Sequence, residues 1–390
     1  MLIYSLILHI RHFLYDKGIL KSYSTELPSV CIGNVSAGGT GKTPMTELVV
    51  KTLLENDVPA ADAELFGFEK DSLFFQQRAD VAVLSRGYKR ETKGFQQVTV
   101  GGTAQQFGDE PLQIKKKFPE VTVAVDADRV EGCDLLTHPE KIELLKPRKK
   151  AAIVDPKFGR SDVIVLDDAF QYRRIKATKN IVLTTYRKPY YKDFLLPLGG
   201  LRDLRGRARK ADMIVVTKCP TYLTDEQRSK MAKRLGLNDY SVERCEGVNR
   251  DGKVQKLLFA TIAYDTLVPV FPEGDPRYVH SKAAILFTGI ANDKPLLYYL
   301  AETYQIKSHH RYPDHHYYTA SDMETLAYAA TKHSIAVVVT TEKDAQRLSD
   351  IRFKINEDLR HRLFYAPIRA QMLTAAEQTC LRDFLYELNN

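Results

Sequence analysis

Hydrophobic residues recur in short blocks along most of the chain, and their spacing predicts alternating strands and helices. Between residues 28 and 220 the blocks are almost wholly apolar, which is typical of strands buried on both faces of a sheet. Helical patterns such as Met45–Leu54 lie between several of them, so the sequence predicts an α/β fold with a mostly parallel sheet. The predicted strands are 28–34, Val81–Ser85, Val121–Val125, Val163–Leu166, Ile181–Thr184 and Met213–Thr217.

The first twenty residues combine an apolar face with basic residues on the opposite side. The apolar residues recur at three- and four-residue steps, which predicts an amphipathic helix. Two placements stay open: the helix lies in a membrane interface with its cations near acidic head groups, or it docks on the protein's own core. The apolar face is Leu2, Ile3, Leu6, Ile7, Ile10, Phe13 and Leu14, and the basic side is His9, Arg11, His12, Lys17 and Lys21.

A glycine-rich run, Gly38-Gly39-Thr40-Gly41-Lys42-Thr43, joins the first predicted strand to the first predicted helix of the sheet. Glycines let backbone N–H groups converge on phosphate oxygens, and the helix adds its positive end. Lys42 would reach the β- and γ-phosphates of a nucleotide, and Thr43 would offer its hydroxyl to Mg²⁺. The strict phosphate-loop pattern has a glycine where this chain has Ser36, and Gly38-Gly39 can supply the missing curvature.

Two carboxylates, Asp167 and Asp168, follow the predicted strand Val163–Leu166. Oxygen ligands at the end of a strand beside a phosphate loop suit Mg²⁺. Thr43, Asp167 and Asp168 are therefore the predicted metal-proximal residues. The whole sheet region, 28–220, is predicted to be a P-loop nucleotide-binding domain.

A smaller set of elements follows residue 220, so we predict an N-terminal helix at 1–27 and a second, smaller α/β domain at 221–390. The elements predicted for this domain are strands at 256–268, Ala283–Thr288 and Ile335–Thr341 and helices at Leu296–Tyr304 and Met323–His333. The segments 57–80 and 138–159 look like insertions that decorate the surface and carry no chemical motif.

The composition limits the classes of binding partner but does not identify one. The chain has 390 residues and a formal net charge of +8, which is too dilute to indicate nucleic acid and fits an anionic ligand or an acidic membrane surface. No apolar run approaches the ~18–20 residues of a membrane span. Five cysteines without a CxxC spacing predict reduced thiols in a cytosolic protein.

Further motifs occur in a fixed order along the chain, and together they resemble the tetraacyldisaccharide 4′-kinase (lipid A 4′-kinase) family of Gram-negative bacteria. The resemblance extends from the N-terminal helix to about Asp344. This chain departs from the family pattern at Ala169, where the family usually has glycine, and at Asp203, where it usually has glutamate. The motifs are Gly33-Asn34, the glycine-rich run, Ser85-Arg86-Gly87-Tyr88, Gly108-Asp109-Glu110-Pro111, Asp167-Asp168-Ala169-Phe170-Gln171, Leu196–Asp203 and Pro313-Asp314-His315.

The resemblance implies a reaction and a location. The reaction is ATP- and Mg²⁺-dependent phosphate transfer to the 4′-hydroxyl of an acylated glucosamine disaccharide 1-phosphate, a step of lipid A biosynthesis. The enzyme would be peripheral on the cytoplasmic face of the inner membrane. We expect a monomer without a nucleic-acid partner.

The resemblance also implies roles for single residues. Asp109 would be the catalytic base, and His315, with Asp314 beside it, would orient Asp109 or relay its proton when the smaller domain closes. The histidines at 309, 310, 315 and 316 lack a recognised zinc spacing, so we do not predict a metal there. Residues 340–344 match a family motif and are expected beside the cleft without a role. The predicted substrate-binding residues are Arg86, Arg129, Arg202 and Asp203.

Two other functions stay open on the residues alone, because a phosphate loop does not define a reaction. A membrane-associated P-loop ATPase switch would need a positioned water and no small-molecule acceptor. A small-molecule ligase of the dethiobiotin synthetase type would need a closed polar pocket and would have no use for the N-terminal helix.

Overall fold

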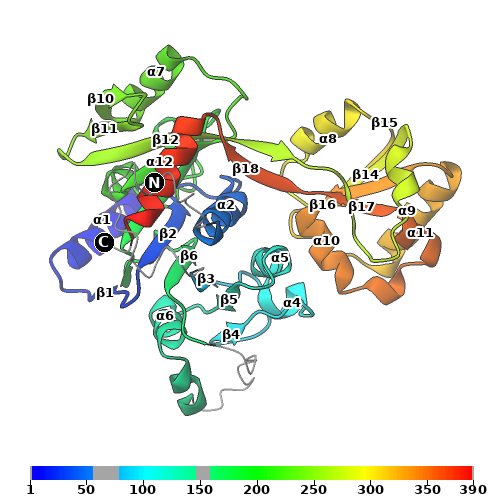
Figure 1. Cartoon of the computed structure of the whole chain (residues 1–390), viewed down its shortest axis with the longest axis horizontal. Coiled ribbons are helices and arrows are strands. Elements are labelled where there is room, and N and C mark those ends of the chain that lie inside the picture. The colour runs from blue at the N-terminus through cyan, green and yellow to red at the C-terminus, as the bar shows by residue number, and fades with distance from the viewer. Residues whose placement is uncertain (1, 56–78, 146–158, 389–390) are drawn as a thin grey trace, which may run out of the picture.

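The computed structural model describes residues 2–55, 79–145 and 159–388, which form a larger and a smaller α/β unit (Figure 1). Over these residues the larger unit contains an 11-stranded sheet and the smaller unit a five-stranded sheet. The predicted insertions at 57–80 and 138–159 lie largely outside the described residues. An α/β fold with a large, mostly parallel sheet is confirmed.

The larger sheet is parallel across its centre and antiparallel at its edges. The seven strands from β12 to β5 pair in parallel, and the edge pairs β10–β11, β11–β12 and β4–β5 are antiparallel. In sheet order the strands are β10 (Leu237–Ser241), β11 (Glu246–Asn249), β12 (Val254–Tyr264), β9 (Met213–Thr217), β8 (Lys179–Thr185), β2 (Ser29–Asn34), β6 (Val163–Asp167), β3 (Val81–Ser85), β5 (Thr122–Val125) and β4 (Gln96–Gln97).

Helices cover both faces of this sheet, as the near-continuous apolar strands require. One face carries α2 (Lys42–Leu54), α4 (Ala104–Phe107), α5 (Asp109–Lys117) and α12 (Ala375–Tyr386). The other face carries α6 (Arg129–Thr137) and α7 (Asp225–Leu235). The glycine-rich run lies between β2 and α2, in the strand–loop–helix order that the sequence predicts.

The smaller unit is a second, mostly parallel sheet with helices on both faces. β15, the next strand in the chain after β14, pairs on one side of β14, and β16 pairs on its other side. The topological switch point therefore lies between β14 and β16. In sheet order the strands are β13 (Val268–Pro269), β17 (Leu363–Ala366), β16 (Val337–Thr341), β14 (Ala283–Thr288) and β15 (Gln305–Arg311). Its helices are α8 (Lys294–Ala301), α9 (Ala320–Lys332), α10 (Glu342–Ser349) and α11 (Glu357–Arg362).

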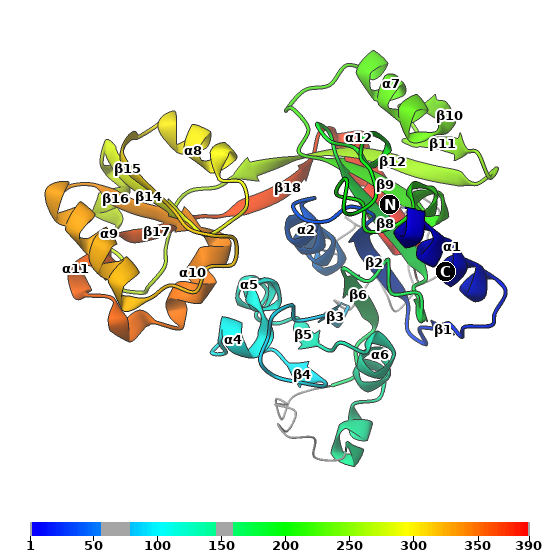
Figure 2. The same cartoon turned by 180° about the vertical axis from the view of Figure 1, so that it is seen from behind.

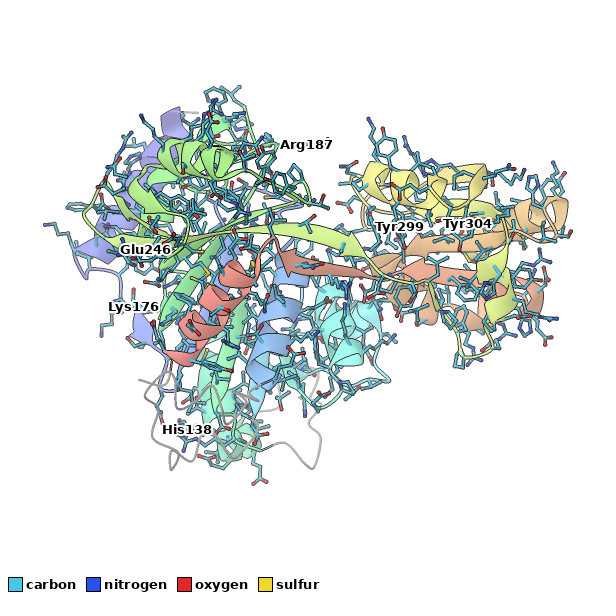
Figure 3. All side chains as sticks on the ribbon, turned by 45° about the horizontal axis from the view of Figure 1, so that its top comes forward. His138, Lys176, Arg187, Glu246, Tyr299 and Tyr304 are labelled. Carbon is cyan, nitrogen blue, oxygen red and sulfur yellow. The ribbon has the colours of Figure 1, made fainter. Side chains whose placement is uncertain are left out.

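Two antiparallel strands connect the units (Figures 1 and 2). The first half of β12 pairs with β9, and its second half pairs with β18 (Ile368–Met372) on the way to the smaller unit. At the far end Tyr264 stacks on Tyr299 of α8, with ring centroids 4.5 Å apart, and Figure 3 labels Tyr299 on this unit.

The structure differs from the predicted domain boundary at residue 220. Residues 225–264 and 368–388 belong to the larger unit, because they extend its sheet and cover it.

The N-terminal helix α1 (Leu2–Asp16) docks through polar residues and the buried Leu8, and leaves most of its predicted apolar face exposed. Within α1, His12 is 5% exposed and Arg11 is half-buried, which contradicts the expectation that these cations face head groups. The predicted docking of the apolar face on the core is also wrong. The exposed fractions are 77% for Ile3, 59% for Leu6, 55% for Ile7, 50% for Ile10 and 55% for Phe13.

Gly33, the fifth residue of β2, packs directly against the turn that follows β6. A Cβ atom at this position would lie 2.5 Å from Phe170 Cβ and 3.1 Å from Phe170 N. Neither atom is the end of a flexible side chain, so the turn itself would have to move. The absence of a side chain at Gly33 therefore sets how closely the glycine-rich run and the turn after β6 approach.

We expect Gly33→Ala to lower the free energy of unfolding by ~1–3 kcal/mol, because overpacking at a fixed backbone forces a shift. The measurement is urea unfolding of both proteins. Gly101→Ala is the matched control, since a Cβ there would meet nothing within 4 Å. Equal losses in the two variants would contradict the close contact at Gly33.

Candidate active site

The glycine-rich loop has the backbone shape that converging N–H groups require. Three of its glycines adopt left-handed conformations that residues with a Cβ rarely adopt. Asn34 Nδ2 donates to Thr40 Oγ1 at 2.6 Å, and Thr217 Oγ1 donates to the Thr40 carbonyl at 2.7 Å, so the ends of β2 and β9 hold the loop. Thr43 is buried in the first turn of α2. The φ angles are 68° at Gly38, 51° at Gly39 and 83° at Gly41.

Two acids at the end of β6 lie beside this loop, as predicted. Asp167 is 3% exposed and accepts hydrogen bonds from Thr46 Oγ1 at 3.2 Å and Ser85 Oγ at 3.0 Å. Burial, together with the negative charges of Glu110 and Asp168, raises the pKa of Asp167 to about 6. The crowding of carboxylates at this point favours a bound cation.

Asp168 faces the loop lysine. Its backbone is left-handed, with φ 49°, and its carboxylate lies 3.7 Å from Lys42 Nζ. Arg202 Nη2 donates to Asp168 Oδ1 at 3.2 Å and to Asn34 Oδ1 at 2.8 Å. Arg202 is placed there because its own N–H donates to the Val35 carbonyl at 2.8 Å, which aligns residues 200–203 beside the glycine-rich loop.

The other predicted substrate residues lie in different surroundings. Asp203 is 1% exposed and its Oδ1 is 2.6 Å from His12 Nε2, so it anchors α1 instead of facing a ligand. Arg129 is 2% exposed and donates to the Asp126 carbonyl at 2.9 Å. Arg86 is exposed at the end of β3. Of the four, Arg202 contacts an acid of the candidate site directly.

Asp109 is the first residue of α5 and meets the smaller unit. Its Oδ2 lies 3.2 Å from His315 Nδ1 and accepts a hydrogen bond from Arg347 Nε at 3.0 Å. Burial favours the neutral acid, but the hydrogen bonds from His315 and Arg347 lower the pKa of Asp109 to about 2. The predicted Asp109–His315 pair is therefore assembled across the two units, whereas Asp314 is about half exposed and 4.0 Å from His315 Nε2.

Helix α10 carries site residues that the sequence reasoning missed. Arg347 binds Asp109, and Lys343 forms an ion pair with Glu110, the next residue of α5. The motif at 340–344 indicated that this segment lies beside the cleft. Nothing in the spacing of Arg347 indicated that its side chain reaches another unit.

The remaining histidines of the 309–316 segment have separate hydrogen-bond partners. Each is paired with a nearby side chain of the smaller unit. The pairs are His309 with Asp293 at 2.7 Å, His310 with Ser308 at 3.1 Å and His316 with Asp322 at 2.9 Å.

A buried ion cluster lies behind the loop where α2, α5 and α10 meet. Lys117 Nζ of α5 lies 2.7 Å from Glu47 of α2 and 3.7 Å from Glu342 of α10. Gln113 Nε2 donates to Glu47 Oε1 at 2.7 Å. Burial raises the pKa of Glu47 to about 7, even though the charge of Lys117 opposes it.

Comparisons with known proteins give one consistent result. The family model for tetraacyldisaccharide-1-P 4′-kinase matches residues 1–61 and 72–387. A Porphyromonas gingivalis protein named tetraacyldisaccharide 4′-kinase is 34% identical over 387 residues, covering 96% of this chain and 92% of the relative. One of the same name from Flavobacterium johnsoniae is 36% identical over 375 residues, covering 95% and 91%.

A solved structure shares the fold. It is the "apo" form of LpxK from Aquifex aeolicus in complex with ATP, with a TM-score of 0.63 and 23% sequence identity. The superposition covers 99% of this chain and 96% of that chain. The two-unit architecture is therefore not peculiar to this chain.

The buried Glu47 makes stability depend on pH between about 4.5 and 7. Its pKa in the folded protein lies above the ordinary value of 4.5, so the folded state binds the extra proton and stability is lost as the pH rises through 7. We expect the wild type to lose on the order of 2 kcal/mol of its free energy of unfolding between pH 5 and pH 8, and Glu47→Gln not to show this loss. Thermal unfolding across this range measures it, with the exposed Glu55→Gln on the same segment as control. Parallel pH profiles for wild type and Glu47→Gln would contradict this assignment.

Proposed function

The chain belongs to the tetraacyldisaccharide-1-P 4′-kinase family, and we propose how its residues divide the work of that reaction. It is an ATP-dependent kinase that transfers the γ-phosphate to the 4′-hydroxyl of tetraacyldisaccharide 1-phosphate in lipid A biosynthesis. The observation that carries the division of roles is the arrangement of Asp109. It is the first residue of α5 and contacts His315 and Arg347 of the smaller unit, while its neighbour Glu110 adds to the negative charge around Asp167 and is stabilised by the charge of Lys42.

The loop residues 38–43 bind the triphosphate of ATP in this proposal. The left-handed glycines turn backbone N–H groups toward the phosphate oxygens, and α2 directs its positive end at them. Lys42 neutralises charge on the β- and γ-phosphates. Its present partner, Asp168, keeps the ammonium group beside the loop at 3.7 Å.

Mg²⁺ fits the acids after β6. Asp167 and Asp168 offer carboxylate oxygens, Thr43 offers a hydroxyl, and these are ligand types that Mg²⁺ prefers. The raised pKa of Asp167 reflects a surplus of negative charge that a divalent cation would offset. When bound, Mg²⁺ supplies neutralisation of the phosphate oxygens. Arg202 holds Asp168 in place through a hydrogen bond to Oδ1.

Asp109 receives the proton of the 4′-hydroxyl. Phosphoryl transfer proceeds through a loose transition state in which the new bond forms late, so a carboxylate of low pKa is an adequate acceptor. Both described partners of this carboxylate, His315 and Arg347, bind Oδ2. The other oxygen, Oδ1, is therefore the atom that faces the incoming hydroxyl.

Helix α1 places the enzyme on the membrane that holds its substrate. Its exposed apolar face suits the boundary between head groups and acyl chains, with the helix axis in the plane of the interface. Within the described residues, no helix is both long enough and apolar enough to cross a bilayer. On the exposed apolar face of α1, we propose peripheral attachment at the cytoplasmic face of the inner membrane, by a monomer.

Asp109→Asn keeps the size of the side chain and removes the proton acceptor. We expect kcat to fall by ~10²–10⁴-fold with ATP affinity within threefold, because the substitution leaves the glycine-rich loop intact. The assay is ATP, Mg²⁺ and tetraacyldisaccharide 1-phosphate, with mass analysis for one added phosphate, and Asp134→Asn on the surface is the control. Full activity of Asp109→Asn would exclude Asp109 as the base. A wild type that binds ATP and makes no product would exclude the reaction itself.

Replacing Ile3, Ile7 and Ile10 by serine removes much of the apolar face of α1. We expect binding to vesicles of phosphatidylethanolamine and phosphatidylglycerol to weaken by at least ~10³-fold, because each of the three buried apolar side chains contributes ~1.5–3 kcal/mol. Sedimentation with the vesicles measures it. Phe353→Ser is the control, because Phe353 is 81% exposed on the smaller unit. Unchanged binding of the triple variant would contradict attachment through α1.

A further inference from the structure

Arg347 of α10 is 3% exposed and forms hydrogen bonds in both units. Toward the larger unit, its Nε and Nη2 both donate to Asp109 Oδ2, the Nε contact measuring 3.0 Å. Toward its own unit, Nη1 donates to Asp344 Oδ1 at 2.8 Å and to the Gly289 carbonyl at 3.1 Å. One edge of the guanidinium group is thus held by the smaller unit, and another edge binds the carboxylate of Asp109.

The support behind Arg347 is rigid. Asp344 is fully buried, and its Oδ2 accepts hydrogen bonds from Gly289 N at 3.0 Å and Thr341 Oγ1 at 2.6 Å. Gly289 has no room for a side chain, since a Cβ there would lie 2.9 Å from Asp344 Oδ1. Arg347 therefore cannot rotate away from Asp109 without breaking a buried ion pair.

The position of this cluster in the smaller sheet is informative. Gly289 directly follows β14, and Asp344 and Arg347 lie in the helix that directly follows β16. The cluster therefore fills the switch point at the carboxyl ends of these strands, which is where open α/β sheets place ligands. In this protein an arginine occupies that position and extends into the other unit.

The same cluster also holds His315. The Gly289 carbonyl accepts a hydrogen bond from His315 N at 3.0 Å, and Arg347 Nη2 lies 3.2 Å from His315 Nδ1. His315 itself has a left-handed backbone, with φ 61°. Arg347 and His315, which both bind Asp109 Oδ2, are therefore both hydrogen-bonded to the Gly289 carbonyl, which fixes the distance between them.

We propose that Arg347 is a positioning residue for phosphate transfer: it holds Asp109 by Oδ2, keeps His315 at a fixed distance and leaves Oδ1 free for the acceptor hydroxyl. The inference rests on the proposed role of Asp109 as base. Because Arg347 belongs to the smaller unit, the base is oriented only when the two units meet. The Asp344–Arg347 pair, and not His315 alone, is then the contribution of the smaller unit to the reaction.

The charge of Arg347 also affects when Asp109 is ionised. Losing this cation removes a hydrogen-bonding positive charge while burial and neighbouring acids remain, so the pKa of Asp109 rises. The acid limb of kcat/KM must then move to higher pH. The charged and titratable groups that face Asp109 are His315 and Tyr317 from the loop after β15, Arg347 and Lys343 from α10, Asp350 after α10, and Glu110 on its own helix.

The test compares the wild type with Arg347→Gln, Arg347→Lys and the double variant Arg347→Gln/Asp344→Asn, which removes the fully buried charge of Asp344 that would otherwise lose its ion pair. Lys116→Gln is the matched control, because Lys116 Nζ makes a contact of 3.3 Å with Ser349 between the same two helices. The assay measures kcat, KM for ATP and for tetraacyldisaccharide 1-phosphate, and the pH dependence of kcat/KM. Thermal unfolding with and without ATP verifies folding.

We expect ~100-fold lower kcat for the two glutamine variants, KM values within threefold, and an acid limb at least one pH unit higher. Arg347→Lys should recover the position of the acid limb and only part of kcat. Lysine keeps the positive charge but lacks the planar group whose several N–H donors bind Asp109 and Asp344 together. The control should match the wild type. A lower kcat with an unmoved acid limb, or no change, overturns the role of Arg347 while product from the wild type still supports the kinase. A wild type without product overturns both.

Discussion

The arrangement of the site depends on one electrostatic constraint, the neutralisation of the acidic start of α5 by the cations of α10. Asp109 faces Arg347 in surroundings largely withdrawn from water, and Glu110 faces Lys343 in a pair that is about one-third exposed. A charge in such surroundings is costly unless it is paired and hydrogen-bonded. Arg347 also pairs with Asp344 of its own unit, but the carboxylates of Asp109 and Glu110 find their cations on α10 of the smaller unit, so the contact between the units is specific in position. Lys117, which bridges Glu47 and Glu342, continues the same contact behind the glycine-rich loop.

The parts of the fold that follow from local physics could be predicted from the sequence. Val81–Ser85, Met213–Thr217 and Ala283–Thr288 are strands with the predicted bounds, because apolar runs of this length fit only a buried strand between turns. The glycine-rich loop is equally local, since its shape depends on residues that tolerate positive φ. Asp167 and Asp168 follow from the same reasoning, because the carboxyl ends of parallel strands meet at one edge.

The parts that could not be predicted are contacts between residues far apart in sequence. Arg347 reads as an ordinary cation near the end of a short helix, and only the fold brings it to Asp109. His12 reads as part of a solvated basic face, yet it pairs with Asp203, 191 residues away. The boundary at residue 220 failed for a related reason. The turn there looks like a domain end, but β12 returns to pair with β9 before the chain leaves the sheet.

The anchoring of α1 explains why a buried polar pair occurs so close to the phosphate site. Asp203 binds His12 of α1, and the neighbouring Arg202 binds Asp168, so the helix and the acid proposed to hold the metal are held by consecutive residues. Arg11 donates to the Gln171 carbonyl at 2.9 Å, on the turn that follows the same acids. An apolar docking face would have held α1 as firmly but would have consumed the surface proposed to meet the membrane. Polar anchoring keeps that surface free, and in the proposed attachment it would fix the distance between the lipid layer and the glycine-rich loop.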